Sequence, residues 1–433
     1  MNEEEIVKKI LNKIKSKEDD KVLKKVEEVL KSIDEELIRR NIKAKCFLGG
    51  SLAKGTYLPD DYDADVFVRF DYSVYADKNN ELSDFLEQAL EKFKPKRVHG
   101  SRDYFQFKRK GINFEVVPVL NINSIEEAKN ITDISPLHVL WFRNKANEKI
   151  IDSVRLSKLF CKANEVYGAE SFVRGFSGHV LDILNVHYKS FLRFIREAAS
   201  WDDKIRRGEK IVVDVENFHK GKALFNLNKS KTTGPLIVID PIQKDRNAAA
   251  ALSEEKLLKF IDSAKRFLKK PSEKFFEEKK FSEKDAVGKA RKKDAVVVIN
   301  LTPKTRKSID VLGCKLLKAY NTIKKHIEEE DFSIRWEKFS WEKKENKEAV
   351  CVFIIKNPII KEPKIIVGPP SDMKDAVNNF KKKHRRTKIH KGRVIAIEKR
   401  RFKRIDDLVK TIIQSGELKD KIRGASFKII KVQ

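Results

Sequence analysis

The chain has 433 residues, of which 40% are hydrophobic, so it can fill the cores of roughly two to four domains and is not disordered throughout. Its 94 lysines and arginines outnumber its 65 aspartates and glutamates, and the formal net charge of +29 predicts a polyanionic partner. No apolar run approaches the roughly 20 residues that span a bilayer, and the acidic first residues are unlike a signal peptide. We therefore expect a cytoplasmic protein without a membrane partner.

The cysteines predict no structural metal site. Cys46, Cys161, Cys314 and Cys351 form no C-x-x-C pair and have no closely spaced histidine partner. Cys46 and Cys351 lie in strand-like runs, and Cys161 lies on an apolar helical face. Buried, reduced thiols are therefore expected, in agreement with a reducing cytoplasm.

Residues 1–145 are expected to form a small mixed α/β head. Apolar residues at helical spacing from Ile6 to Val29 predict one or two amphipathic helices that end near Arg40. After them the patterns indicate two strands, a helix and a hairpin of two more strands. These elements are predicted over residues 44–48, 64–70, 85–93, 104–108 and 112–120.

Two further regions follow the head. Residues 146–270 show helical stripes from Leu156 to Ala163 and from Val180 to Ile195, the second after Ser177 as a candidate N-cap. In residues 271–433 strands and helices alternate, which predicts an α+β arrangement. Strands are predicted near 295–301, 350–355, 394–397 and 427–432, with helices near 311–327, 372–383 and 405–413. The Lys/Glu-rich stretch 269–293 is expected to be a linker or an exposed helix.

Three acidic residues in the head predict a metal site. Asp63 and Asp65 are two apart on a strand, so their carboxylates point to one face and Ala64 to the other. Two such charges about 4 Å apart repel by on the order of 4 kcal/mol at an effective dielectric near 20, so they need a cation, and oxygen ligands suit Mg²⁺. Glu115 lies in an apolar strand and would join them if the two strands pair. The alternative is an acidic turn shared with 60–61, with Glu115 as an edge charge.

A glycine-rich loop precedes these acids. Gly49, Gly50 and Ser51 lie between a predicted strand and a helix start, where backbone N–H groups and a hydroxyl could hold a triphosphate. Lys54 could add a positive charge there. A plain tight turn is the alternative.

The order of these features resembles the polymerase-beta-type nucleotidyltransferase superfamily: a Gly-Gly-Ser-Leu-Ala-Lys-Gly loop, an Asp-x-Asp pair and a later acid in a Val-Val-Pro strand. Further segments are similar to those of the archaeal-type (class I) CCA-adding enzymes, in the same order and at similar spacing. They are Ser135-Pro-Leu-His138, Val154-Arg-Leu-Ser-Lys158, residues 162–170, Arg174-Gly-Phe-Ser-Gly178, and Asp240-Pro with Asp245-Arg-Asn247. Beyond about residue 260 the likeness depends on length and a basic tail.

The resemblance implies a multidomain α/β and α+β fold with a polymerase-beta-like head, a helical neck, an α+β body and a basic tail. Head, neck and body would be residues 1–145, 146–270 and 271–433, the neck binding nucleotide and tRNA. The implied activity is untemplated addition of C, C and A to the tRNA 3′ end from CTP and ATP, with Mg²⁺ as cofactor and release of pyrophosphate. It leaves open whether the chain forms a homodimer.

The same resemblance implies roles for individual residues. Asp63 and Asp65 would bind metal, with Glu115 as the third acid. Triphosphate or ribose would be contacted by Gly50, Ser51, Lys54, His138, Lys158 and Tyr167, and Arg246 would help to select the base. Each has a plainer alternative: an exposed helix residue for Lys158, a packing residue for His138 or Tyr167, and an ion pair with Asp240 or Asp245 for Arg246. The family usually has Asp where this chain has Glu115. The extra methylene group of Glu could displace the carboxylate by about 1 Å, and such a displacement can cost on the order of a hundredfold in rate.

The C-terminal region carries a dense basic run. Residues 381–404 contain 13 lysines and arginines and a single acid, Glu398. We predict that this run grips RNA phosphates and reads the shape of the tRNA acceptor stem, the alternative being a solvated tail. The predicted RNA contacts are Lys381, Lys382, Lys383, Arg385, Arg386, Lys388, Arg400 and Arg401.

These sequence features support three hypotheses for the function of the protein. The leading hypothesis is CCA addition to tRNA. The second is another transferase of the superfamily, of the poly(A) or oligoadenylate type. The third is a noncatalytic RNA-binding protein whose site has been lost through Glu115.

Overall fold

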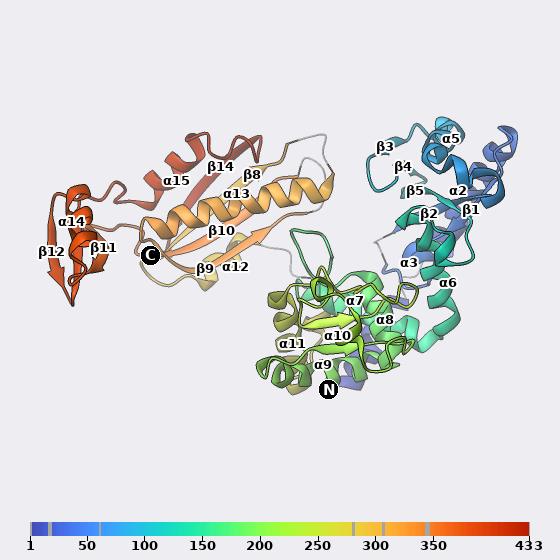
Figure 1. Ribbon diagram of the computed structural model, residues 1–433, viewed down its shortest axis with the longest axis horizontal. Helices are drawn as coiled ribbons and strands as arrows, with labels where there is room; N and C mark the ends of the chain where they lie inside the picture. The colour runs from blue at the N-terminus through green and yellow to red at the C-terminus, as the bar shows by residue number, and fades with distance from the viewer. Residues whose placement is uncertain are drawn as a thin grey trace. The chain divides into compact units, whose positions relative to one another are not determined.

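The computed structural model describes residues 2–15, 20–59, 62–278, 282–304, 308–342 and 347–432. The chain divides into two compact units, Met1–Lys279 and Lys280–Gln433, called here the N-terminal and C-terminal units. Figure 1 shows that both units combine helices and sheets, which confirms the predicted mixed, multidomain fold. No helix within the described ranges has the length and apolar character that a bilayer crossing requires.

A five-stranded sheet forms the centre of the head, in the order β1-β2-β5-β4-β3. Strands β2 and β5 run parallel, and the other neighbours are antiparallel. The buried face carries Ala64, Val66, Val68 and Phe70, as the alternation along the strand predicts. The strands are β1 (Ala44–Leu48), β2 (Asp63–Phe70), β3 (Lys96–Val98), β4 (Tyr104–Arg109) and β5 (Ile112–Leu120).

Helices complete the head core. Val26 and Ile33 of α2 (Asp20–Arg39) pack in one apolar cluster with Leu86 of α5 (Leu82–Leu90) and the sheet. Two short helices lie on either side of β2 in the sequence, α3 (Gly50–Ala53) before it and α4 (Tyr72–Tyr75) after it.

The first helix, α1 (Glu3–Lys15), does not pack in this head core. Its Ile6, Ile10 and Ile14 lie in a second cluster with the helices that follow residue 140, although the sequence had grouped it with the head. The apolar stripe of α1 packs against the apolar side chains of the helical neck and not against the head sheet. The domain limits at 145 and 270 remain predictions.

That second cluster is the core of the helical neck. Phe160, Phe194, Phe260 and Phe267 are fully buried in it. Its helices are α6 (Ser135–Lys145), α7 (Glu148–Ala163), α8 (Gly178–Tyr188), α9 (Phe191–Arg206), α10 (Ala223–Asn226) and α11 (Glu254–Lys269), with a parallel pair of strands, β6 (Ile211–Val213) and β7 (Leu236–Val238). Ser177 caps α8 as predicted, because its side chain accepts a hydrogen bond from the Val180 N–H at 3.1 Å.

The C-terminal unit contains a four-stranded antiparallel sheet in the order β14-β8-β10-β9. Helices α13 (Ile309–Glu329) and α15 (Ile405–Gln414) cover one face, along which Figure 1 shows α13 lying, and Ala286 of α12 (Glu283–Lys289) packs on the other. The strands are β8 (Ala295–Thr302), β9 (Ser333–Ser340), β10 (Ala349–Lys356) and β14 (Gly424–Lys431). The Lys/Glu-rich stretch thus contains a partly buried helix, while its residues 279–281 lie outside the described ranges.

A smaller module lies between β10 and α15. It has a sheet in the order β11-β13-β12 with α14 (Lys374–Lys383) packed against it. Its strands are β11 (Lys364–Pro370), β12 (Thr387–His390) and β13 (Arg393–Glu398). Strands β9, β11 and β12 were not predicted, because almost all of their residues are exposed or half-buried and they lack the clear burial pattern of a core strand. The basic run therefore lies on a folded module.

Candidate active site

The three acids of the head lie on neighbouring parallel strands. Asp65 of β2 is directly opposite Glu115 of β5, and Asp63 is opposite Asn113. Ala64 and Val66 are buried on the other face, so both aspartates face away from the core. The Asn113 side chain donates a hydrogen bond to Asp63 at 3.1 Å, and Gln106 donates one to Glu115 at 3.0 Å.

The electrostatics of this group favour a cation. Burial, followed by the charges of Glu115 and Asp63, raises the pKa of Asp65 to about 6. Burial also raises the pKa of Glu115, and Asp63 adds to that shift against the hydrogen bond from Gln106. Lys54 and Lys158 act on Asp65 in the opposite direction, but they do not cancel the burial and the repulsion. A bound cation would stabilise the buried, ionised carboxylates and offset the repulsion between them.

The glycine loop lies directly against Asp65. The Gly49 N–H donates to the backbone oxygen of Asp65 at 2.7 Å. Gly50 has a positive φ of 57°, and a Cβ there would lie 1.6 Å from the Oδ2 atom of Asp65. A side chain is therefore excluded at Gly50, both by the backbone conformation and by the carboxylate. Ser51 follows within the first turn of α3 and is half-buried.

Two lysines lie beside the acids. Lys158 of α7 is 6% exposed and donates to the Thr56 carbonyl at 2.9 Å. Lys54 forms an ion pair with the buried Asp182 of α8. Sequence reasoning missed Asp182, although an acid within the apolar run Val180–Leu184 is the same signal that identified Glu115.

The first turn of α8 connects these lysines to Tyr167. A Cβ built on Gly178 would lie 3.3 Å from the Tyr167 hydroxyl and 3.7 Å from Cε of Lys158. The chain therefore places Lys158, Tyr167 and the start of α8 together. A hydroxyl, an ammonium group and helix N–H groups at one place suit the oxygens of a phosphate.

A second polar group surrounds Asp240, which follows β7. Nε2 of His138 lies 2.9 Å from Oδ1 of Asp240, Nε2 of His179 lies 3.1 Å from Oδ2, and Nη1 of Arg246 lies 3.0 Å from Oδ2. The alternative of an ion pair between Arg246 and Asp240 is thus observed. His179 was not predicted, because no pattern distinguishes it from its neighbours in α8.

The two polar groups differ in the metals they suit. Among the described residues, His138, His179 and Asp240 form a group whose ligand atoms lie within 4.8 Å of one another, a spacing that the three head acids do not reach. The head acids offer oxygen alone, which suits Mg²⁺, whereas imidazole suits transition metals. The carboxylate of Asp240 already accepts hydrogen bonds from Arg246 and from backbone N–H groups. The head acids therefore fit a divalent ion better. Asp60 and Asp61, the suggested acidic turn, lie outside the described residues.

The predicted RNA contacts occupy two different environments in the C-terminal unit. Lys381, Lys382 and Lys383 end α14, and they are exposed, as are Arg385, Arg386, Lys388 and Arg401. Arg400 is 7% exposed and donates to the Glu330 carbonyl at 2.8 Å and to Asp331 at 2.9 Å. Arg400 therefore anchors the small module to the body, and its predicted contact with RNA does not fit this position.

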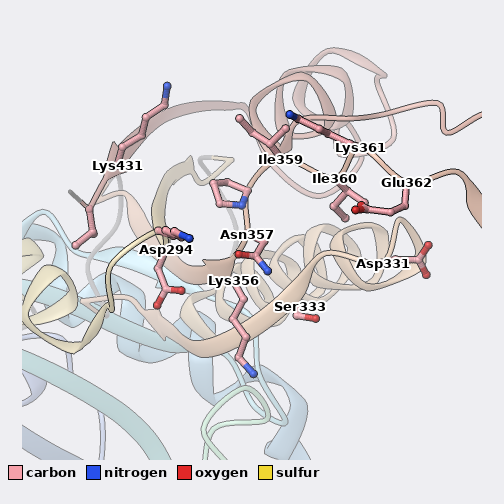
Figure 2. A pocket seen from close by; sticks show the side chains of 13 residues that line it. Asp294, Asp331, Ser333, Lys356, Asn357, Ile359, Ile360, Lys361, Glu362 and Lys431 are labelled. Atoms are coloured by element: carbon pink, nitrogen blue, oxygen red, sulfur yellow. The ribbon is translucent and has the colours of Figure 1, made fainter.

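A cavity of about 670 Å³ lies beside this anchor, and only residues of the C-terminal unit line it. Figure 2 shows side chains of both charges around it, among them Asp331, Lys356 and Glu362. Two of its acids are engaged, Asp294 with Arg335 and Asp331 with Arg400. The cavity thus belongs to the junction between body and module.

Family comparisons agree with this geometry. A model described as a nucleotidyltransferase domain matches residues 23–131, and one described as the second domain of tRNA nucleotidyltransferase matches residues 152–277. Fold and site thus define a nucleotidyltransferase. A third model, the C-terminal domain of CCA-adding enzymes, matches residues 291–425.

Curated relatives identify the particular family. A CCA-adding enzyme of Methanocaldococcus jannaschii is 32% identical over 95% of this chain and 91% of its own length. That of Nanoarchaeum equitans is 39% identical over 48% of this chain and 51% of its own length. The chain belongs to the CCA-adding enzyme family. A solved RNA terminal U-transferase is 17% identical with a TM-score of 0.48, over 64% of this chain and 99% of that one.

Proposed function

We propose that the chain adds C, C and A to the 3′ end of tRNA without a template, transferring nucleotidyl groups from CTP and ATP and releasing pyrophosphate. The observation that carries this proposal is the parallel register of β2 and β5, which sets Asp65 opposite Glu115 with Asp63 two residues away on the same face. Membership of the family agrees with it.

Mg²⁺ is the proposed cofactor, held by Asp63, Asp65 and Glu115. Oxygen ligands and the raised pKa of Asp65, caused by burial and by neighbouring carboxylates, support this choice. When bound, the metal would favour ionisation of the tRNA 3′-hydroxyl and neutralise the triphosphate.

The chain's own cations would orient the nucleotide. Lys158 and Tyr167 converge at the start of α8, and Gly50 and Ser51 lie against Asp65, so these groups are proposed to bind the triphosphate. Lys54 would join them only after its ion pair with Asp182 opens. The base and ribose would be read at the group around Asp240, which contains His138 and Arg246.

The exposed cations of the small module are proposed to bind the acceptor stem of tRNA. A-form stems hide their major groove, so contacts with phosphates and 2′-hydroxyls are expected. The proposed set is Lys381, Lys382, Lys383, Arg385, Arg386, Lys388 and Arg401. Arg400 is left out because it is buried.

The test is incorporation of labelled CTP and ATP into tRNA that lacks its 3′ CCA, with Mg²⁺. The Asp65→Asn variant is expected to lose incorporation by at least about a hundredfold while it still binds tRNA, because a metal ligand is removed. Asp71→Asn is the matched control, since Asp71 directly follows the same strand and caps α4 by accepting a hydrogen bond from the Ser73 N–H. Full activity of Asp65→Asn would contradict the proposal.

The same assay separates the remaining hypotheses. Unlimited A addition would indicate a poly(A)-type transferase, and tRNA binding without incorporation would indicate a noncatalytic protein. Omitting Mg²⁺ tests the metal. The homodimer and the cytoplasmic location remain predictions, which light scattering of the purified protein and cell fractionation would test.

A further inference from the structure

Asp240 is a fully buried acid at the centre of the second polar group. Its Oδ1 accepts hydrogen bonds from two backbone N–H groups of the following turn, at 2.9 and 3.0 Å, and both oxygens face Nε2 of His138. Its Oδ2 also accepts from His179 and Arg246. Burying a carboxylate is strongly unfavourable unless it is fully hydrogen-bonded, and here five groups donate to it.

This geometry sets the proton positions on His138. Burial acts to raise the pKa of Asp240, but hydrogen bonds from His138 and His179 hold it well below its ordinary value, so the group is ionised. An ionised carboxylate only accepts hydrogen bonds, so Nε2 of each ring carries a hydrogen. Burial, together with the charges of His179 and Arg246, lowers the pKa of His138 against the pull of Asp240, which leaves its Nδ1 with a lone pair. Within the described residues no protein group forms a hydrogen bond with that Nδ1 atom.

The loop around Asp240 keeps Arg246 in the same arrangement. The Asp240 N–H donates to the Arg246 carbonyl at 3.0 Å, while Arg246 Nη1 returns to the carboxylate. The Arg246 side chain is still 46% exposed, so its other edge faces outward. The two histidine rings lie with centroids 4.4 Å apart. One carboxylate thus organises three side chains from separate segments.

We propose that Asp240 is a positioning residue that fixes His138 as a hydrogen-bond acceptor, through Nδ1, for a donor group of the incoming nucleotide, with His179 and Arg246 held beside it. This proposal rests on the proposed function and deepens it. The triphosphate has only acceptor oxygens at neutral pH, so it is not the partner of Nδ1. The donors are a ribose hydroxyl or the exocyclic amine, which cytosine and adenine share and which uracil and guanine replace by oxygen.

The first experiment measures the positioning role. Asp240→Asn is expected to raise KM for CTP and ATP about tenfold or more with a smaller change in kcat, because hydrogen bonds to a charged group are lost. In ¹⁵N-histidine NMR of the full chain, His138 is expected to change from one tautomer to a mixture. Asp214→Asn is the matched control, since Asp214 accepts two backbone N–H bonds, from Phe218 and His219, in the same region.

The second experiment identifies the donor. Incorporation of 2′-deoxy-CTP tests the ribose hydroxyl, and incorporation of UTP tests the amine, each against CTP. The proposal expects His138→Ala to reduce one of these two preferences about tenfold and to leave the other unchanged. Two unchanged preferences would overturn it.

Other outcomes also decide the proposal. Stoichiometric Zn²⁺ binding that Asp240→Asn abolishes would overturn it in favour of a metal site. An unchanged tautomer in Asp240→Asn would overturn the positioning role. Should the wild-type chain fail to incorporate any nucleotide, the proposed function fails, while the NMR result and equilibrium CTP binding still test Asp240 separately.

Discussion

At the scale of single residues, Gly50 is the position in the site where a side chain is most strictly excluded. A Cβ at this position would meet Oδ2 of Asp65 at 1.6 Å. Gly50→Ala is expected to lower kcat by at least about a hundredfold, because the Asp65 carboxylate, which is proposed to bind the metal, must move by about 1 Å or more. The control is Gly208→Ala, which has a similar positive φ of 76° and no atom within 4 Å of the added Cβ. Equal activity of both variants in the incorporation assay would contradict this account.

Glu115 is the other decisive residue, because its extra methylene group departs from the aspartate usual in the family. Its Oε2 accepts a hydrogen bond from Gln106 at 3.0 Å, which positions the longer side chain. We expect Gln106→Leu to lower kcat about tenfold, since hydrogen bonds to charged groups contribute about 1.5–3 kcal/mol. Glu115→Asp should also lose activity, because the shorter acid does not reach Gln106. A Glu115→Asp variant faster than the wild type would show that the site is not adapted to glutamate.

At the scale of elements, the pairing of β2 and β5 predicts a stability that depends on pH and on Mg²⁺. The folded-state pKa of Asp65, about 6 through burial and its acidic neighbours, exceeds its ordinary value, so the folded chain binds this proton more tightly than the unfolded chain. The free energy of unfolding should therefore decrease as the pH rises from about 4 to about 6. This group alone should account for a decrease on the order of 3 kcal/mol. Mg²⁺ should raise Tm at pH 7.5 and much less at pH 5.

The Asp65→Asn variant tests that prediction by thermal unfolding with and without Mg²⁺. It should be more stable than the wild type at pH 7.5 without metal, and its Mg²⁺ increment should disappear. Asp71→Asn should keep the increment, since Asp71 is the N-cap of α4 and its side chain accepts a hydrogen bond from the Ser73 N–H. An increment of equal size in Asp65→Asn would place the metal elsewhere.

At the scale of the whole molecule, the net charge of +29 predicts RNA binding that weakens steeply with salt. Each neutralised phosphate contributes roughly 0.7–0.9 to the slope of log K against log salt. Replacing Lys381, Lys382 and Lys383 by Gln should therefore reduce the slope by about 2, while Tm stays unchanged because all three are exposed. Arg400→Gln should do the reverse, lowering Tm and leaving the slope, since Arg400 binds Asp331 and two carbonyls. Fluorescence anisotropy with labelled tRNA would measure both slopes.

Much of this protein was determined by local sequence alone. Alternating and helical apolar patterns predicted β2, β5, α8 and the strands β8, β10 and β14 of the C-terminal sheet, because the period of burial is a local property. The Asp-x-Asp pair placed two carboxylates on one face for the same reason. The tertiary structure decided which partners met: Glu115 opposite Asp65, Lys54 with Asp182, and both histidines on Asp240. Those contacts join residues far apart in the chain, and strand register and helix packing, rather than any local pattern, bring them together. The same holds for Arg400, whose place within a basic run gave no sign that it would be buried.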